Sequence, residues 1–315
     1  MEMEQIKLLQ NQNQHVVESP LLSITIPTYN RRPFLQQTIE ALHPQIGKDV
    51  EILICDNCSP DDTWAYLGSL DSSIRLIRHE TNIGAERNIL ACLEQARGQY
   101  VWTLCDDDLP CDDTVNQIRQ AIAQFDHPSV LFLTSKWCSD PITERNQITC
   151  GSHWTLLDQN SFLERVSFWF TVASSIVVRR DSVDRSFVNR WIGSSLVPAA
   201  ITLSTVGAHN QVAVPDGPLV ICRGGNSGGY DALKVFTTNV HDLLNACARL
   251  GYDRSVLDKT YEENLKGVVS YVIKEWPIDA DGVKNLVTSS YRYKNFYRVA
   301  LPKLFGRALR RLETR

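Results

Sequence analysis

The sequence lacks any apolar run that is long enough to cross a bilayer. A transmembrane helix needs about 18 or more consecutive apolar residues, and no such run occurs among the 315 residues. The N-terminal segment is polar and rich in Gln and Asn, without the basic start and apolar core of a secretory signal peptide. We therefore expect residues 1–20 to form a flexible lead and the protein to be cytoplasmic.

Glycine is absent from the loop that follows the first expected strand. No glycine occurs from Pro27 to Pro33, whereas a nicotinamide-dependent oxidoreductase needs a G-x-G-x-x-G turn there so that the backbone can approach the pyrophosphate. A sugar nucleotidyltransferase also usually carries a glycine-rich loop at this point. The missing glycine argues against both classes of enzyme.

Neither an excess of basic residues nor a dense cysteine framework is present. Lys and Arg number 32 against 36 Asp and Glu, a net charge of -4, which gives no reason to expect a nucleic-acid partner. The 9 cysteines are scattered and odd in number, as expected for reduced thiols in the cytosol. Cys55 and Cys58 have no second cysteine pair or histidine pair nearby, so we interpret them as small residues at a strand end, not as a zinc site.

The first half of the chain alternates between strand and helix patterns. Short β-branched runs are separated by segments in which apolar residues recur at helical spacing, as do Val115, Ile118 and Ile122. This alternation predicts an α/β fold with a mostly parallel central sheet flanked by helices. We expect strands at 22–27, 50–55, 74–77, 100–104, 130–134, 174–178, 212–214 and 219–222, helices at 33–42, 64–70, 82–96, 114–125 and 162–170, and a mainly helical C-terminal region from 235.

Three polar clusters follow strand ends in this pattern: Thr28–Arg32, Asp56–Ser59 and Asp106–Asp108. In a parallel α/β sheet the ligands bind beyond the carboxyl ends of the strands. The pattern therefore predicts that these three polar clusters, each at the end of a different strand, lie at one edge of the sheet.

The run Asp106-Asp107-Asp108 is the most informative of these clusters. Adjacent carboxylates repel one another, which disfavours burying them without a cation, and their oxygens suit hard divalent ions such as Mg²⁺ or Mn²⁺. Such an ion can bridge the two phosphates of a nucleotide diphosphate. The alternative is a solvated acidic turn before the 114–125 helix, where acids also favour the helix dipole.

Other residues in the clusters suit a nucleotide. Asp56 can accept a hydrogen bond from a nucleobase, Tyr29 can stack on one, and Arg31 can meet phosphate. The segment Asn82–Asn88 opens a helix whose free amides, with Arg87, could face an anion. For each there is a plain structural alternative, namely a turn former, a helix-entry loop or a helix cap.

In their order and spacing these features resemble the family 2 glycosyltransferases, whose fold is called GT-A, across about residues 21–135. The triple aspartate followed by Leu109 looks most like the abequosyltransferase-like branch, which adds deoxysugars in O-antigen synthesis. The residues that carry the resemblance are Ser23–Arg31, Ile52–Ser59, Asn82-Ile83-Gly84, Gly98–Val101 and Asp106–Asp108.

The resemblance implies metal-assisted, inverting transfer of a sugar from a nucleotide diphosphate donor to a glycan or lipid-linked glycan, with Mg²⁺ or Mn²⁺. It implies a donor-binding half at 21–135, an acceptor-side half of the same domain at 136–235, and a helical region at 236–315. The three aspartates Asp106, Asp107 and Asp108 would stand in for the family's D-x-D metal motif, the last two by preference in direct contact. The residues implied around the nucleotide sugar are Pro27, Thr28, Tyr29, Asn30, Arg31, Asp56, Asn57, Asn82, Gly84, Arg87, Asp106 and Asp107.

The general base that such a transfer needs is not marked by a clear motif. Asp181 and Asp184 follow an expected strand and are candidates, although a helix cap and a surface acid explain them equally well. Pro198 stands where the resemblance implies a histidine. This departure keeps open the alternative of a catalytically degenerate GT-A protein that only binds a glycan or a partner.

Two further segments have a functional and a plain interpretation. The glycine-rich stretch 224–229 suits a lid over the donor or acceptor, or an ordinary surface loop. Basic and apolar residues alternate over 294–315, which suits an anionic membrane surface, or a packed terminal helix with a basic outer face. With a lipid-linked acceptor, this tail would place the enzyme on the inner face of the plasma membrane.

Overall fold

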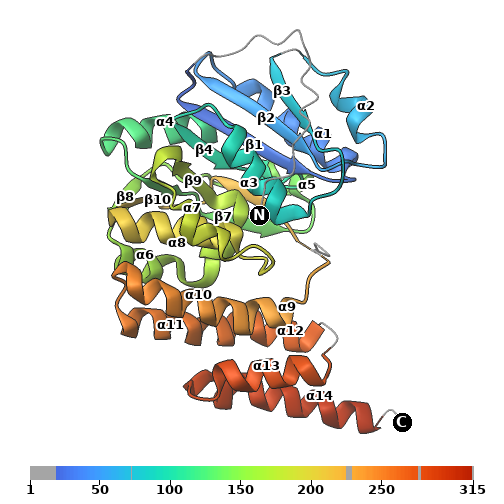
Figure 1. Cartoon of the computed structure of the whole chain (residues 1–315), viewed down its shortest axis with the longest axis vertical. Coiled ribbons are helices and arrows are strands. Elements are labelled where there is room, and N and C mark those ends of the chain that lie inside the picture. The colour runs from blue at the N-terminus through green and yellow to red at the C-terminus, as the bar shows by residue number, and fades with distance from the viewer. Residues whose placement is uncertain (1–18, 72, 225–228, 276–277, 314–315) are drawn as a thin grey trace. The chain divides into compact units, whose positions relative to one another are not determined.

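The computed structural model describes residues 19–71, 73–224, 229–275 and 278–313 (Figure 1). These residues form two compact units. Unit 1 takes the described residues of 1–157, 172–185 and 211–226, and unit 2 takes those of 158–171, 186–210 and 227–315. The chain thus passes between the units several times, which differs from the sequential boundaries at 135 and 235 that the sequence suggests.

The large sheet of unit 1 has eight strands in the order β3-β2-β1-β4-β9-β6-β10-β8. Strands β1 to β4 are mutually parallel, whereas β9 runs antiparallel to both β4 and β6, and β8 is antiparallel to β10. The strands are β1 (Leu22–Thr28), β2 (Val50–Asp56), β3 (Ile74–Arg78), β4 (Tyr100–Thr103), β6 (Val130–Phe132), β8 (Trp154–Leu157), β9 (Ile176–Arg179) and β10 (Val212–Pro215).

A second, three-stranded sheet has the order β5-β11-β7, and its strand β5 follows the acidic run directly in the sequence. Its strands are β5 (Leu109–Pro110), β7 (Ser135–Cys138) and β11 (Val220–Arg223). Strand β5 is only two residues long, and the burial of β7 does not alternate cleanly, so neither carries the period-two pattern by which strands are predicted.

Helices cover both faces of the parallel strands because successive side chains of a strand point to opposite sides. Ile52 and Ile54 of β2 share a core with Leu35 and Ile118 from two helices, whereas Cys55 meets Cys92 of a third. The α-helices of unit 1 are α1 (Arg32–Leu42), α2 (Thr63–Leu67), α3 (Ala85–Gln95), α4 (Thr114–Gln124) and α5 (Pro141–Glu144). Its 3₁₀ turns are η1 (His43–Gln45), η2 (Arg145–Gln147), η4 (Ala173–Ser175) and η5 (Arg180–Ser182).

Unit 2 is helical in every described element, which confirms the expected C-terminal region. Three π-helical turns, η6 (Val235–Asn239), η8 (Leu265–Val269) and η9 (Phe296–Ala300), interrupt its α-helices, and η3 (Ser167–Thr171) and η7 (Ala248–Leu250) are 3₁₀ turns. The α-helices are α6 (Gln159–Val166), α7 (Arg185–Asn189), α8 (Val197–His209), α9 (Ala232–Lys234), α10 (Val240–Cys247), α11 (Arg254–Asn264), α12 (Ser270–Glu275), α13 (Ala280–Ser290) and α14 (Leu301–Glu313).

Helix α8 was missed by sequence reasoning. Every residue from Val197 to Val206 is buried, so the helix is buried on all sides and has no amphipathic period to detect. Across the described helices, none combines the length and apolar character that crossing a bilayer demands.

Candidate functional site

Three neighbouring strands end at one edge of the large sheet. Strand β1 lies between β2 and β4, and all three are parallel. Thr28 at the end of β1 is in register with Asp56 at the end of β2, and the acidic run Asp106–Asp108 follows β4. The sheet order therefore brings together the polar residues at the ends of these three strands, which are far apart in the sequence.

Asp56 is fully buried at the end of β2. Its carboxylate accepts from the backbone N–H of Ser59 at 3.2 and 3.3 Å and pairs with Arg78 Nε at 3.2 Å. Burial raises the pKa of Asp56, and the Ser59 hydrogen bond and the Arg78 charge oppose that rise. The carboxylate is thus held in place by its own turn, and Asn57 N–H joins this turn to the Thr28 carbonyl at 2.9 Å.

Asn57 and Asn82 tie the turn after β2 to the loop before α3. Asn57 donates to Asn82 Oδ1 at 2.9 Å and accepts from the backbone N–H of Ile83 at 2.9 Å. Gly84 caps α3 with a φ of 85°, a conformation that a side chain would strain. Helix α3 therefore begins at Ala85, three residues later than expected, with the exposed Arg87 in its first turn.

The loop after β1 presents exposed groups beside these turns. Tyr29 and Asn30 are exposed and Pro27 is half-buried. Asn30 adopts a positive φ of 55°, and its backbone N–H donates to Ser59 Oγ at 2.8 Å. The loops after β1 and β2 are thus joined, with the Tyr29 ring left open to solvent.

The three adjacent aspartates have three different partners. Asp106 accepts from Thr28 Oγ1 at 2.7 Å, and Asp107 pairs with the Arg31 guanidinium at 2.5 Å. Asp108 accepts from Ser174 Oγ at 2.5 Å and from the backbone N–H of Arg223 at 3.0 Å. All three aspartates are buried, so the run is not the solvated acidic turn that was the alternative interpretation of the sequence.

Burial sets the protonation of two of these aspartates. It raises the pKa of Asp106 to about 7, and the hydrogen bond from Thr28 opposes the rise. It also raises the pKa of Asp108 to about 6, with a further contribution from the charge of Asp107. Even with Arg31 beside Asp107, ionising Asp106 and Asp108 together near neutral pH is therefore unfavourable without a further positive charge.

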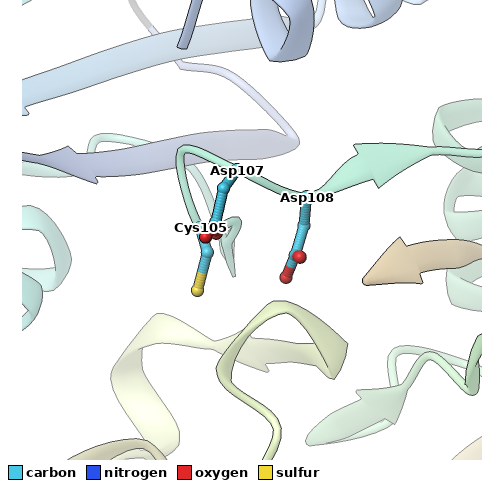
Figure 2. A group of neighbouring side chains, drawn as sticks. All are labelled: Cys105, Asp107 and Asp108. Carbon is cyan, nitrogen blue, oxygen red and sulfur yellow. The ribbon is translucent and has the colours of Figure 1, made fainter. Parts of the chain in front are cut away.

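A metal ion fits part of this cluster. One ligand atom each from Cys105, Asp107 and Asp108 lie within 4.8 Å of one another, and Figure 2 shows the three side chains on one side of the turn. Burial raises the pKa of the Cys105 thiol well above its usual range, which keeps it protonated and a poor ligand for a hard ion. The donor set that suits Mg²⁺ or Mn²⁺ is thus the pair of carboxylates from Asp107 and Asp108.

Thr38, Ser174 and Arg223 support the cluster and were not identified from the sequence. Thr38 Oγ1 of α1 lies 3.0 Å from the carbonyl oxygens of both Asp106 and Asp108. The Arg223 side chain donates to Gln37 Oε1 at 2.8 Å and lies 4.7 Å from the Phe34 ring centroid. Ser174 lies just before β9 and Arg223 ends β11, so both have the sequence signal of a strand end, whereas Thr38 lies inside α1 and has no such signal.

The structure does not bring Asp181 and Asp184 to this edge. Because β9 is antiparallel to β4, its register pairs Arg179 with Tyr100 at the start of β4. Asp181 is exposed there and pairs with Arg179 Nε at 3.0 Å, and Asp184 lies three residues further on. A base must reach the reacting hydroxyl, so their position at the opposite end of β4 from the acidic run speaks against this role.

Two sequence features remain, the proline at 198 and the glycine-rich stretch. Pro198 lies in the first turn of α8, where its fixed φ and missing N–H suit a helix start. This local role explains a proline at the position where the resemblance implies a histidine. Most of the glycine-rich stretch falls at 225–228, outside the described residues, so the lid stays a prediction.

Comparisons with known proteins agree with this arrangement. The family model described as "Glycosyl transferase family 2" matches residues 23–187. Abequosyltransferase RfbV of Salmonella typhimurium is 28% identical over 231 residues, 65% of this chain and 67% of that protein. The UDP-Glc:alpha-D-GlcNAc-diphosphoundecaprenol beta-1,3-glucosyltransferase WfaP of Escherichia coli is 37% identical over 89 residues, which is 28% of this chain and 36% of that protein.

Solved structures share the fold at low identity. TarS 1-349 of S. aureus, in complex with UDP-GlcNAc, superposes with a TM-score of 0.61 and 15% identity over 85% of this chain and 79% of that one. The mannosyltransferase PcManGT of Pyrobaculum calidifontis, in complex with GDP-Man and Mn²⁺, gives a TM-score of 0.52 and 11% identity over 98% and 90%. The predicted GT-A fold is thereby confirmed. Because the family model matches more than half of the chain and the longest of these sequence matches is to an abequosyltransferase, the chain belongs to glycosyl transferase family 2, in its abequosyltransferase-like branch.

Proposed function

We propose that this glycosyltransferase moves a hexosyl or deoxyhexosyl unit from a nucleotide diphosphate sugar to a glycan or lipid-linked glycan, in O-antigen-type polysaccharide synthesis. The observation that carries the proposal is the meeting of Thr28, Arg31 and Asp56 with the buried acidic run at the ends of β1, β2 and β4. The similarity to RfbV supports a deoxyhexose donor.

In this proposal the nucleobase lies against Pro27, Tyr29 and Asp56. Tyr29 is exposed and can stack on the base. The hydrogen bonds from Ser59 fix the position of the Asp56 carboxylate, which can then accept a hydrogen bond from one edge of the base. The remaining donor contacts come from residues on the joined loops around this turn, namely Thr28, Asn30, Arg31, Asn57, Asn82, Gly84 and Arg87.

The proposed metal ligands are the carboxylates of Asp107 and Asp108, with Mg²⁺ or Mn²⁺ as the ion. When bound, such an ion neutralises the diphosphate and makes it a better leaving group. Asp106 has a different task, because the ligand atoms that lie within 4.8 Å of one another come from Cys105, Asp107 and Asp108 and not from Asp106. It holds the turn in shape through its hydrogen bonds with Thr28 and Thr38.

The reaction is a single displacement with inversion. The acceptor hydroxyl oxygen forms a bond to the anomeric carbon while the bond from that carbon to the diphosphate oxygen breaks. The hydroxyl proton passes to a general base, and the electron pair of the broken bond leaves with the nucleotide diphosphate. Arg31 pairs with Asp107, one of the proposed metal ligands, and its guanidinium can also pair with the negative charge that develops on the diphosphate.

The acceptor proposed here is lipid-linked. Two relatives are named as glucosyltransferases that act on diphosphoundecaprenol-linked or PP-undecaprenol-linked sugars, at 37% and 36% identity over 28% of this chain. These matches span about a third of each relative. A lipid-linked acceptor would place this enzyme at the inner face of the plasma membrane.

Calorimetry with UDP, GDP, CDP and dTDP, each with Mn²⁺ and with chelator, tests the proposal. Metal-dependent binding of one nucleotide, lost in an Asp107→Ala, Asp108→Ala variant that remains folded, would support the donor site and name the base. If a nucleotide binds but the matching donor sugar is neither transferred nor hydrolysed, the degenerate glycan-binding alternative is correct. If no nucleotide binds to the folded protein, the donor-site assignment is wrong.

A further inference from the structure

Large aromatic side chains are exposed on the C-terminal helices of unit 2. Tyr271 is 60% exposed, Tyr291 59%, Tyr297 55% and Phe305 62%. They come from α12, the end of α13, η9 and α14. Helix α12 packs against both η9 and α14, so three of these four residues come from elements that contact one another. Exposed aromatic side chains on adjoining elements are typical of a surface that another molecule covers.

The same part of the chain carries a strong charge of one sign. Residues 282–312 hold 8 of the 32 Lys and Arg residues and none of the 36 Asp and Glu residues. The rest of the chain therefore has 24 basic and 36 acidic residues, a net charge of -12. Positive charge is thus concentrated next to the exposed aromatic residues in an otherwise acidic protein.

Contacts with α12 and η8 fix which side of the last helix points outward. Phe296 and Ala300 of η9 are buried, Lys303 donates to Ser270 Oγ, and Arg307 donates to the Ile273 carbonyl at 2.6 Å. These four residues repeat every three or four positions and so share one face, which packs inward. The apolar residues Tyr297, Leu301, Leu304 and Phe305 form a second stripe at the same spacing, beside the packed face.

Two basic residues flank that second stripe. Lys294 and Arg298 are exposed, whereas the head groups of Lys303 and Arg307 are engaged within unit 2. The segment is therefore more than a packed helix with a basic exterior, because the exposed Tyr297 and Phe305 and the half-buried Leu301 and Leu304 form an apolar stripe beside its exposed cations.

We propose that this surface, made of Tyr271, Tyr291, Lys294, Tyr297, Arg298 and Phe305 and here named the aromatic–basic surface, binds anionic phospholipid. Aromatic rings prefer the level of the headgroups at a membrane interface. An amphipathic helix with Lys and Arg beside an apolar stripe lies in that interface, and its cations are attracted to anionic lipid. The inference goes beyond the transfer reaction, since it assigns a binding surface in unit 2 that the donor site of unit 1 does not require.

The charge distribution favours lipid over a second copy of the chain. A symmetric dimer through this surface would bring the same cations face to face, because each partner presents the same patch. An anionic membrane supplies the opposite charge over an area large enough to meet several helices at once. The surface also extends the predicted 294–315 segment back to Tyr271 and Tyr291.

Sedimentation of the full chain with vesicles tests the surface. We expect binding to vesicles of phosphatidylethanolamine and phosphatidylglycerol at 3:1, and at least ten-fold weaker binding to phosphatidylcholine vesicles or in high salt. A Lys294→Glu, Arg298→Glu variant should bind the anionic vesicles at least ten-fold more weakly. A Tyr297→Ser, Phe305→Ser variant, which keeps the charge, should also bind at least ten-fold more weakly.

A matched control changes the same charge elsewhere. Lys48 and Arg249 are exposed and lie outside the aromatic–basic surface, so Lys48→Glu, Arg249→Glu alters the net charge equally and should bind as the unaltered chain does. Circular dichroism shows whether each variant is folded. If the control variant loses as much vesicle binding, the effect is one of general charge and the proposal is overturned. Absence of binding of the unaltered chain to anionic vesicles would also overturn it. A dimer that is lost in the Tyr297→Ser, Phe305→Ser variant, without vesicle binding, would overturn it in favour of self-association. None of these outcomes depends on donor binding.

Discussion

The Arg31 guanidinium lies 2.5 Å from the carboxylate of Asp107, one of the two proposed metal ligands. The Asp107 side chain is 6% exposed and that of Arg31 29%, so the pair is screened only in part. A cation that binds Asp107 must share it with this arginine or replace it, and a diphosphate offers Arg31 a new anionic partner. Donor and metal binding are therefore expected to be coupled through this pair.

Removing Arg31 should separate these two effects. In Arg31→Ala, Mn²⁺ should bind more tightly in the absence of nucleotide, by up to about ten-fold, because a competing pair worth on the order of 1 kcal/mol is lost. The nucleotide diphosphate should bind more weakly. Mn²⁺ titration followed by electron paramagnetic resonance measures the first change and calorimetry the second.

Arg32 provides the control for that experiment. It pairs with Asp62 at 3.1 Å, at a more exposed position, and does not contact the acidic run in any described bond. Arg32→Ala should leave Mn²⁺ affinity unchanged. If Arg31→Ala also leaves it unchanged, the pair does not compete with the metal.

The three aspartates should respond differently to removal of charge. Asp107→Asn and Asp108→Asn should each lower transferase activity by about 100-fold or more, as loss of an electrostatic contact to the leaving group does. Asp106→Asn keeps an acceptor for Thr28, so metal-dependent nucleotide binding should persist, with activity reduced by less than about ten-fold. The opposite order of effects, with Asp106 most sensitive, would assign the metal to the other register of the motif.

Thr28 should contribute to stability through Asp106. Thr28→Val removes the hydroxyl that donates to this buried carboxylate at 2.7 Å, and should lower the free energy of unfolding by about 1–3 kcal/mol. Thr25→Val, earlier on β1, removes a 3.2 Å hydrogen bond to the carbonyl of Trp102 and should lower it by only about 0.5–1.5 kcal/mol. Urea unfolding measures both, and an equal loss would show that Asp106 does not depend on Thr28.

The two base candidates, Asp181 and Asp184, are expected to be dispensable for the reaction. Asp181→Asn and Asp184→Asn should each change kcat by less than about three-fold, since neither side chain lies at the sheet edge where a base would have to act. A loss of two orders of magnitude in either variant, with the fold intact, would contradict the placement of the reaction at the acidic run.

His241 in unit 2 should make stability depend on pH. Burial lowers its pKa, the charges of Arg292 and Arg254 lower it further, and Asp242 opposes them. The folded state therefore favours the neutral ring, and the stabilisation is complete above the unfolded pKa of about 6.5 and declines as the pH falls below it. Urea unfolding at pH 7, 6 and 5 should show this decline, and His241→Gln should reduce it.

The placement of Asp56 and of the acidic run was accessible from the sequence because it depends on local pattern. Alternating apolar residues predict each strand, and a polar residue directly after a buried strand lies at that strand's carboxyl end whatever the rest of the chain does. Since β1, β2 and β4 are parallel neighbours, these ends meet. Family membership followed from the same motifs, which are contiguous in the chain.

The strand direction of β9 was not accessible in the same way. Its pattern predicts a strand but contains no signal for its orientation, and the antiparallel pairing sends Asp181 to the edge opposite the acidic run. Direction is set by which strands it lies between and by the path of the chain before it, which are properties of the whole sheet.

The sequence by itself thus determined the alternating architecture, the strand-end residues and the concentration of basic charge near the C-terminus. Only the tertiary structure decided which partner each aspartate has, because Ser174 and Arg223 reach Asp108 across 66 and 115 residues of chain. It also decided that Phe296 and Ala300 pack inward while Tyr297 and Phe305 face solvent. Periodicity depends on neighbours within a few residues, whereas these contacts depend on the energy of packing elements that are remote in the sequence.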